Sequence, residues 1–164
     1  MSDKIKILLF LGGTLMIIKT YEEKYLDEII LMIKECILEI NQEDYSKKQV
    51  SVWADIDLDD FKESIPKNAQ FILANENIVI GYGDMTDSGY LDRLFVHKNW
   101  QRQGVAKLLL QFLESNCSSK TLSTYSSITA KPFFESQGYK VIKENEAVLR
   151  GEVFLNYYME KCNT

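Results

Sequence analysis

A strand that runs into a helix through a turn with a single glycine is the feature that most restricts the fold of this chain. Residues 90–96, Tyr-Leu-Asp-Arg-Leu-Phe-Val, are apolar and aromatic enough to favour a buried strand. The stretch after Gly104 carries an apolar stripe at helical spacing, formed by Val105, Leu108, Leu109, Phe112 and Leu113. The chain therefore places a core-facing helix directly after a buried strand.

The predicted helix start has the properties of an anion-binding site. Its first backbone N–H groups have no partner within the helix, and the helix dipole is positive at this end. Arg102, Lys107 and Lys98 add full positive charges beside it. These features predict a phosphate or pyrophosphate site. The alternative is an ordinary strand–turn–helix connection whose basic turn faces solvent.

Comparison with known phosphate-binding loops indicates which kind of loop this one resembles. A P-loop requires a second glycine and a Gly-Lys-Ser/Thr ending, and a dinucleotide loop requires three glycines, whereas Gly104 stands alone. The pattern Gln/Arg-x-x-Gly-x-Gly/Ala is met by Gln101, Gly104 and Ala106. Downstream, Ser-Ile-Thr-Ala at 127–130 leads into Lys-Pro-Phe-Phe-Glu-Ser-Gln-Gly-Tyr at 131–139.

Together these two stretches resemble the signatures of the GCN5-related N-acetyltransferases, which bind acetyl-coenzyme A (acetyl-CoA), and the resemblance covers about residues 16–162. It implies transfer of an acetyl group from acetyl-CoA to an amine by direct attack. It also implies that the amides of residues 102–107 bind the pyrophosphate and that the end of the 90–96 strand pairs with the pantetheine arm. The implied cofactor-binding residues are Leu94, Phe95, Val96, Gln101, Arg102, Gln103, Gly104, Val105, Ala106, Lys107, Ser127, Phe133 and Phe134.

The general acid is the point where the chain departs from the family pattern. Many members carry a tyrosine as the second aromatic residue before the Gly-Phe or Gly-Tyr pair, and here that residue is Phe134. Tyr125, Tyr157 and Tyr158 are the available substitutes. Because strand side chains alternate, Tyr157 is expected to face the cleft and Tyr158 the other side. Tyr157 is the predicted acid, with packing in the core or the substrate wall as the alternative.

Asp92 is the predicted general base, since family members often carry a carboxylate near this position. A charge inside a strand is disfavoured, which indicates a specific role. A salt bridge with Arg93 or Arg150 is an equal alternative. His97 is the one histidine, but it is expected to be a surface residue of the turn, away from the acyl group.

The substrate wall is expected to come from the first two helices and their loop. Tyr45 and Trp53, with Glu39 or Asp44, would bind an ammonium by cation–π and charge contacts. Trp53 is equally compatible with a core position. The predicted acceptor is a small-molecule amine. Two alternatives stay open: an acetyl-CoA-binding module without turnover, because Phe134 replaces the tyrosine, and an acetyltransferase that acts on protein amines.

Composition sets the remaining limits. A length of 164 residues corresponds to one domain, placed at residues 16–164. Residues 1–15 are expected to be an upstream extension, with an extra strand or helix packed on the domain as the alternative. A net charge of −5 argues against a nucleic-acid partner. Three widely spaced cysteines predict neither a metal site nor disulfides, and we expect a cytoplasmic monomer or homodimer without a membrane partner.

Hydrophobic periodicity and turn residues predict the remaining elements. We expect an α/β fold with a mixed, mostly antiparallel central sheet and helices on both faces. The acidic run at 55–60 is predicted to be a loop with helix-capping carboxylates, in preference to an electrostatic attractor for an amine. The other predicted elements are strands at 16–20, 71–74, 78–83, 120–125, 139–143 and 152–160 and helices at 26–40, 46–54 and from 129.

Overall fold

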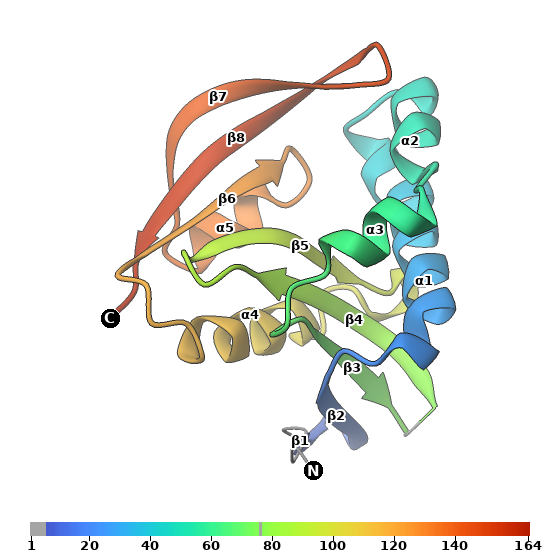
Figure 1. Cartoon of the computed structure of the whole chain (residues 1–164), viewed down its shortest axis with the longest axis vertical. Coiled ribbons are helices and arrows are strands. Elements are labelled where there is room, and N and C mark those ends of the chain that lie inside the picture. The colour runs from blue at the N-terminus through green and yellow to red at the C-terminus, as the bar shows by residue number, and fades with distance from the viewer. Residues whose placement is uncertain (1–5, 76) are drawn as a thin grey trace.

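The computed structural model describes residues 6–75 and 77–164. Within these residues the strands form one eight-stranded sheet in the order β1-β2-β3-β4-β5-β6-β8-β7 (Figure 1). Neighbouring strands are antiparallel except β5 and β6, which run parallel. The predicted mixed, mostly antiparallel sheet is therefore confirmed.

The strands are β1 (Lys6–Leu11), β2 (Thr14–Thr20), β3 (Gln70–Ala74), β4 (Ile78–Met85), β5 (Tyr90–Val96), β6 (Thr121–Ser127), β7 (Lys140–Leu149) and β8 (Glu152–Cys162). The helices are α1 (Leu26–Glu39), α2 (Lys47–Ala54), α3 (Leu58–Ser64), α4 (Val105–Ser115) and α5 (Lys131–Ser136). Three single 3-10 turns are η1 (Glu23–Tyr25), η2 (Asn41–Glu43) and η3 (Lys98–Trp100). In the described part of the chain, no helix is both long and apolar enough to cross a membrane.

Two hydrophobic cores lie on opposite faces of the sheet. Alternate residues of β3 point to opposite faces, because strand side chains alternate. Ile72 joins the core under α4 and α5, whereas Phe71 and Leu73 join the core under α1, α2 and α3. The predicted placement of helices on both faces is therefore confirmed. Any opening in the sheet would connect these two faces.

Local signals set the start of two helices on the α1 side. Ser46 accepts a hydrogen bond from the Gln49 backbone N–H at 3.0 Å, and the Gln49 side chain accepts one from the Ser46 backbone at 2.7 Å. This capping box begins α2 at the predicted place. Asp57 accepts from the Asp60 backbone N–H at 2.9 Å and caps α3. The acidic run thus contains a helix-capping carboxylate, as predicted.

The structure adds elements that the sequence pattern did not indicate. β1 pairs with β2 along its length, so the described part of segment 1–15 forms a strand and turn, and residues 1–5 lie outside the described residues. The expectation that this segment precedes the domain stays a prediction, although the boundary at residue 16 falls inside β2. β7 extends to Leu149 instead of residue 143. The extension begins with the polar run Glu144-Asn145-Glu146, which lacks the apolar alternation that marks a strand.

The β7–β8 hairpin reaches across to α2 at its tip (Figure 1). The Gln49 side chain donates to the Val153 carbonyl at 2.7 Å, and Lys48 lies 2.9 Å from Glu152. The Arg150 guanidinium donates to the Val52 carbonyl at 3.0 Å. These contacts connect the last two strands to the α1–α2 layer, far from them in sequence.

The start of β5 approaches β6 closely at Gly89, and a substitution there tests this approach. A Cβ at Gly89 would lie 2.3 Å from the backbone oxygen of Thr121, and its φ is +87°. Gly151 has a similar φ of +81° with nothing within 4 Å of a Cβ. Gly151→Ala should cost about 1 kcal/mol from backbone strain alone. We expect Gly89→Ala to lower the free energy of unfolding, measured in urea, by at least about 2 kcal/mol more. Equal losses would contradict this close approach.

Candidate functional site

β5 and β6 begin together and then separate. Their parallel pairing covers Tyr90 with Ser123 and Leu91 with Thr124, and no further pair joins them among the described residues. The Thr124 hydroxyl, which is buried, donates to the Leu91 carbonyl at 2.9 Å at the last point of contact. The edge of β5 from residue 92 to 96 that faces β6 is therefore open in the middle of the sheet.

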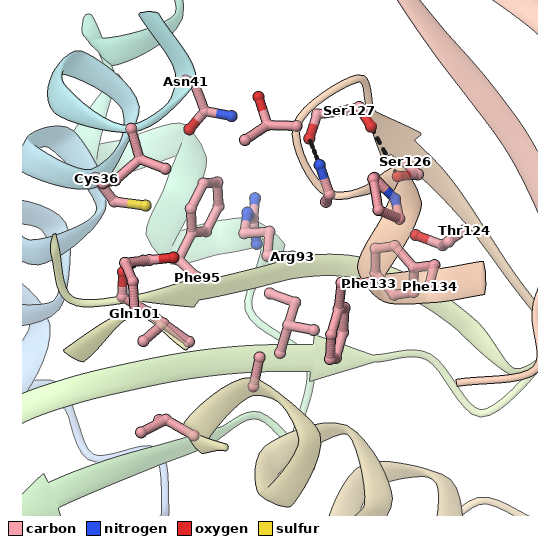
Figure 2. A pocket seen from close by; sticks show the side chains of 18 of the residues that line it. Cys36, Asn41, Arg93, Phe95, Gln101, Thr124, Ser126, Ser127, Phe133 and Phe134 are labelled. Atoms are coloured by element: carbon pink, nitrogen blue, oxygen red, sulfur yellow. Dashed lines mark hydrogen bonds between the residues drawn. The ribbon is translucent and has the colours of Figure 1, made fainter. Parts of the chain in front are cut away.

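A cavity of about 920 Å³ occupies this opening (Figure 2). Its walls come from β5, β6, the start of α4, the loop into α5, and the α1–α2 region. The predicted cofactor residues Leu94, Phe95 and Val96 line it from β5, and Ser127, Phe133 and Phe134 line it from the opposite side. The structure thus brings together the two sequence stretches that carried the family resemblance.

The start of α4 presents free backbone donors to the cavity. The N-cap residue Gly104 is left-handed with φ of 84° and forms no side-chain cap. The first backbone hydrogen bond of the helix runs from the Leu108 N–H to the Gly104 carbonyl at 3.0 Å. The N–H groups of residues 105–107 precede this bond and have no acceptor among the described residues. Donors of this kind at the positive end of a helix fit a phosphate group.

Side chains around this helix start support an anion site. Gln101 donates to the Val96 carbonyl at 2.7 Å and ties the loop to the end of β5. Arg102 and Lys107 line the cavity and bring positive charge. Gln103 does not line the cavity, and its side chain donates to the Asn99 carbonyl at 3.4 Å. The remaining predicted members of the loop, Gly104, Val105 and Ala106, all line the cavity.

The α5 side of the cavity is rigid and mostly apolar. The Ser127 hydroxyl accepts from the Ala130 N–H at 3.0 Å, which shapes the turn before α5 (Figure 2). Phe134 is 4% exposed, and its ring lies 5.3 Å from those of both Phe133 and Tyr139. Phe134 is therefore part of a wall of packed rings. Many family members carry a tyrosine hydroxyl at this position.

The two predicted substrate residues differ in position. Trp53 lines the cavity, and its ring centroid lies 6.3 Å from that of Phe95. Tyr45 does not line the cavity and is 7% exposed. Its hydroxyl donates to the Leu155 carbonyl at 2.7 Å and accepts from the Ile128 N–H at 3.0 Å. Burial and these two bonds make Tyr45 a connection from the η2–α2 loop to β8, a position that does not favour its predicted role as a substrate contact.

Asp92 lies at an irregularity of β5. Arg93 pairs with Asp84 and Leu91 with Met85, which leaves Asp92 as the extra residue of a β-bulge. The bulge turns its carboxylate into the cavity, where the side chain is 45% exposed. Of the two predicted ion-pair partners, Arg93 lies at 3.9 Å, and Arg150 pairs instead with Asp55 at 3.3 Å. Asp92 thus remains accessible to a ligand.

Tyr90 lies beside this carboxylate. Burial raises the pKa of the Tyr90 hydroxyl to about 12, and the neighbouring Asp92 carboxylate adds to the rise. The hydroxyl is therefore protonated at neutral pH, as a hydrogen-bond donor next to a carboxylate must be.

The tyrosines considered as acids lie on different sides of the strands. Tyr125 lines the cavity, just beyond the last β5–β6 pair, and its ring packs 5.0 Å from that of Tyr158. Tyr157 does not line the cavity. Its ring packs against the core under α4 and α5, and the Lys131 ammonium lies 5.0 Å from its centroid. The predicted catalytic role of Tyr157 is not favoured by this position, whereas Tyr125 is at the opening.

Two cavity residues carried no signal in the sequence. Cys36 and Asn41 come from the end of α1 and from η2, where the sequence shows only a continuing helical stripe. Burial raises the pKa of the Cys36 thiol to about 11, so this thiol is not a nucleophile at neutral pH. His97, by contrast, does not line the cavity and accepts from the Asn99 N–H at 3.0 Å, consistent with its expected place in the turn.

Known proteins resemble the chain in both sequence and fold. It is 32% identical over 142 residues to the uncharacterized N-acetyltransferase YafP of Escherichia coli strain K12, an alignment that covers 87% of this chain and 93% of YafP. A GCN5-related N-acetyltransferase from Rhodopseudomonas palustris shares the fold with a TM-score of 0.83 at 20% identity, over 95% of this chain and 98% of that one. The PaiA N-acetyltransferase of Thermoplasma acidophilum, solved in complex with coenzyme A, gives 0.65 at 15% identity over 90% and 98%.

The family model described as an acetyltransferase (GNAT) domain matches residues 41–161, a region that contains β5, the start of α4 and α5. This match spans most of the chain and includes the open edge of β5, the free amides of α4 and the aromatic pair of α5. The chain therefore belongs to the GCN5-related N-acetyltransferase (GNAT) family and is an N-acetyltransferase.

Proposed function

We propose that the protein transfers an acetyl group from acetyl-CoA to the amine of a small molecule by direct attack of the nitrogen on the thioester. The observation that carries this proposal is the opening between β5 and β6, with the free amides of the α4 start at its side. One cavity therefore holds an anion site, an open strand edge and a carboxylate.

The residues of the cavity fit coenzyme A in three places. The amides of residues 105–107, with Arg102 and Lys107, would bind the pyrophosphate. The open edge of β5 offers backbone donors and acceptors to the amide groups of the pantetheine arm, as an added strand would. Phe133 and Phe134 would cover the arm from the α5 side.

The chemistry requires a neutral amine, because an alkylammonium with a pKa of about 10 has no free electron pair. We assign Asp92 as the base that takes the proton, directly or through a water. The nitrogen then forms a bond to the thioester carbon, the carbon–sulfur bond breaks, and coenzyme A leaves as a thiolate. The nitrogen gives up its second proton to water as the amide forms, and this proton restores the acid that protonates the thiolate. Tyr125 lines the cavity, and we assign its hydroxyl as the donor of the proton that this thiolate needs.

Direct attack is preferred over an acyl-enzyme route because of the residues at the cavity. Among the described residues that line it, Cys36 is the one cysteine, and its raised pKa keeps it protonated. Holding an amine next to a thioester in a confined site also supplies much of the rate without a covalent intermediate. Trp53 and Phe95 enclose the cavity on the α1–α2 side, which favours a small acceptor over a protein amine.

The cofactor assignment predicts a ligand-dependent stability. Acetyl-CoA at about 100 times its Kd should raise the free energy of unfolding by roughly 2.7 kcal/mol, which a thermal-shift measurement detects. Gly104→Glu should abolish the shift, because a carboxylate would stand in the anion site. Gly151→Glu is the matched control, since Gly151 has φ of 81°, close to the 84° of Gly104, and lies in the β7–β8 turn. Binding that survives in Gly104→Glu would place the anion site elsewhere.

The catalytic assignments predict a loss of rate without a loss of cofactor binding. Asp92→Asn and Tyr125→Phe should each lower kcat by about 100-fold, as expected when a proton-transfer group is removed. The thermal shift with acetyl-CoA should stay unchanged in both. Tyr157→Phe tests the sequence-based prediction, and we expect it to keep most of the activity. Asp87→Asn, at an exposed carboxylate outside the cavity, is the control. A larger effect at Tyr157 than at Tyr125 would reverse the assignment.

A further inference from the structure

The two faces of the sheet divide the cavity into a cofactor half and an acceptor half. The anion site at α4 lies on the face of the α4–α5 core. Trp53 and Phe95 belong to the opposite core under α1, α2 and α3, and they line the same cavity. Asn41 and Glu43 line it from η2 on this side. An acceptor that meets the thioester at the opening would approach from here.

This half of the cavity carries negative charge that no free cation balances. Asp92 and Glu43 both line it. Among the described lining residues the cations are Arg93, Arg102 and Lys107, and the last two stand at the start of α4. An approaching ligand therefore meets two carboxylates on the acceptor side.

The charge of Arg93 is engaged by two carboxylates, since its Nη2 lies 3.9 Å from Asp92 while its Nη1 pairs with Asp84. Its Nη1 donates to the buried Asp84 carboxylate at 2.9 Å, and its Nη2 donates to the Ser64 hydroxyl. The guanidinium also stacks on the Phe61 ring at 4.2 Å. Asp84 is 1% exposed, so removing Arg93 from this pair would leave a buried carboxylate without its partner. Arg93 is thus held away from the role of binding a substrate carboxylate.

The remaining walls are aromatic and well supported. The Trp53 ring lies 6.3 Å from that of Phe95 and 6.2 Å from that of Phe154, which holds it in place from both sides. Asn41 is 6% exposed, yet no described group hydrogen-bonds to its carboxamide. Figure 2 shows the Asn41 and Phe95 side chains on the α1 side of the cavity, facing the Ser126–Ser127 side. The Asn41 amide lines the cavity and is therefore available to hydrogen-bond a ligand.

We propose that the acceptor is a primary amine with a flat apolar ring and without a carboxylate, and that Asn41 bonds a polar group of the acceptor. The ring would lie against Trp53 and Phe95, and the cationic amine would be drawn toward Glu43 and Asp92. A substrate carboxylate would face these two groups with no free partner of opposite charge. This inference rests on the proposed acetylation of small-molecule amines and narrows it to one class.

A panel of three related amines tests the charge preference. Phenethylamine has the ring and amine, phenylalanine adds a carboxylate, and phenylalaninamide adds a neutral group of similar size. We expect kcat/KM per neutral amine to be at least about tenfold higher for phenethylamine and phenylalaninamide than for phenylalanine. Phenylalanine equal to or better than the other two would overturn the inference. Butylamine, which lacks the ring, should be poorer than phenethylamine, and the reverse order would also overturn it.

A charge reversal provides the matched variants. Glu43→Lys supplies a free cation at the cavity and should reduce the preference for phenethylamine over phenylalanine by about fivefold or more. Glu63→Lys makes the same charge change at an exposed position outside the cavity lining and should alter the ratio much less. Equal effects of both variants would contradict a direct role of Glu43.

Different results reject the acceptor class and the acetylation of small-molecule amines. Turnover of the panel with phenylalanine preferred would remove the acceptor class and keep the acetyltransferase of small amines. A thermal shift with acetyl-CoA but no turnover of any panel amine would reject both proposals. Turnover of a peptide lysine in that case would identify a protein amine as the acceptor.

Discussion

The separation of two parallel strands is the constraint on which the rest of this structure depends. β5 and β6 are joined at Tyr90 and Leu91 and then part, with the Thr124 hydroxyl bonded to the Leu91 carbonyl at the last contact. An unpaired strand edge inside a sheet would normally be costly, because its backbone groups lose their partners. Here the open edge borders a cavity that connects the two faces, so a ligand can take the place of the missing strand.

The two faces of the sheet contribute different parts of the site. On one face, α4 begins directly after β5 and directs its free amides to the cavity, while Gln101 ties the loop to Val96. On the other face, α2 contributes the Trp53 ring, and η2 contributes the Glu43 carboxylate and the Asn41 carboxamide. The buried Arg93–Asp84 pair connects β4 and β5 next to the opening and leaves Asp92 in the bulge accessible. An anionic cofactor and a cationic acceptor would therefore reach the opening from opposite faces.

Contacts between distant parts of the chain complete the site. Tyr45 bonds to Leu155 and Ile128, and the tip of the β7–β8 hairpin bonds to α2. These contacts bring the C-terminal strands over the α1–α2 layer and support the Trp53 ring through Phe154. Phe134, which lacks the hydroxyl of the family tyrosine, packs as a wall. We propose that Tyr125, on β6, acts as the general acid instead.

The sequence by itself determined the features that depend on neighbouring residues. The pattern Gln101, Gly104, Ala106 predicted the anion site because a helix start and a left-handed glycine are local properties. Hydrophobic periodicity and turn residues predicted α1 and α2 for the same reason. Only the tertiary structure decided that Tyr45 is buried, that Tyr157 packs against the α4–α5 core and that Cys36 and Asn41 reach the cavity. Which way a side chain of a strand or helix points depends on a bulge, a register shift or a distant hairpin, and a one-residue shift moves it to the opposite face.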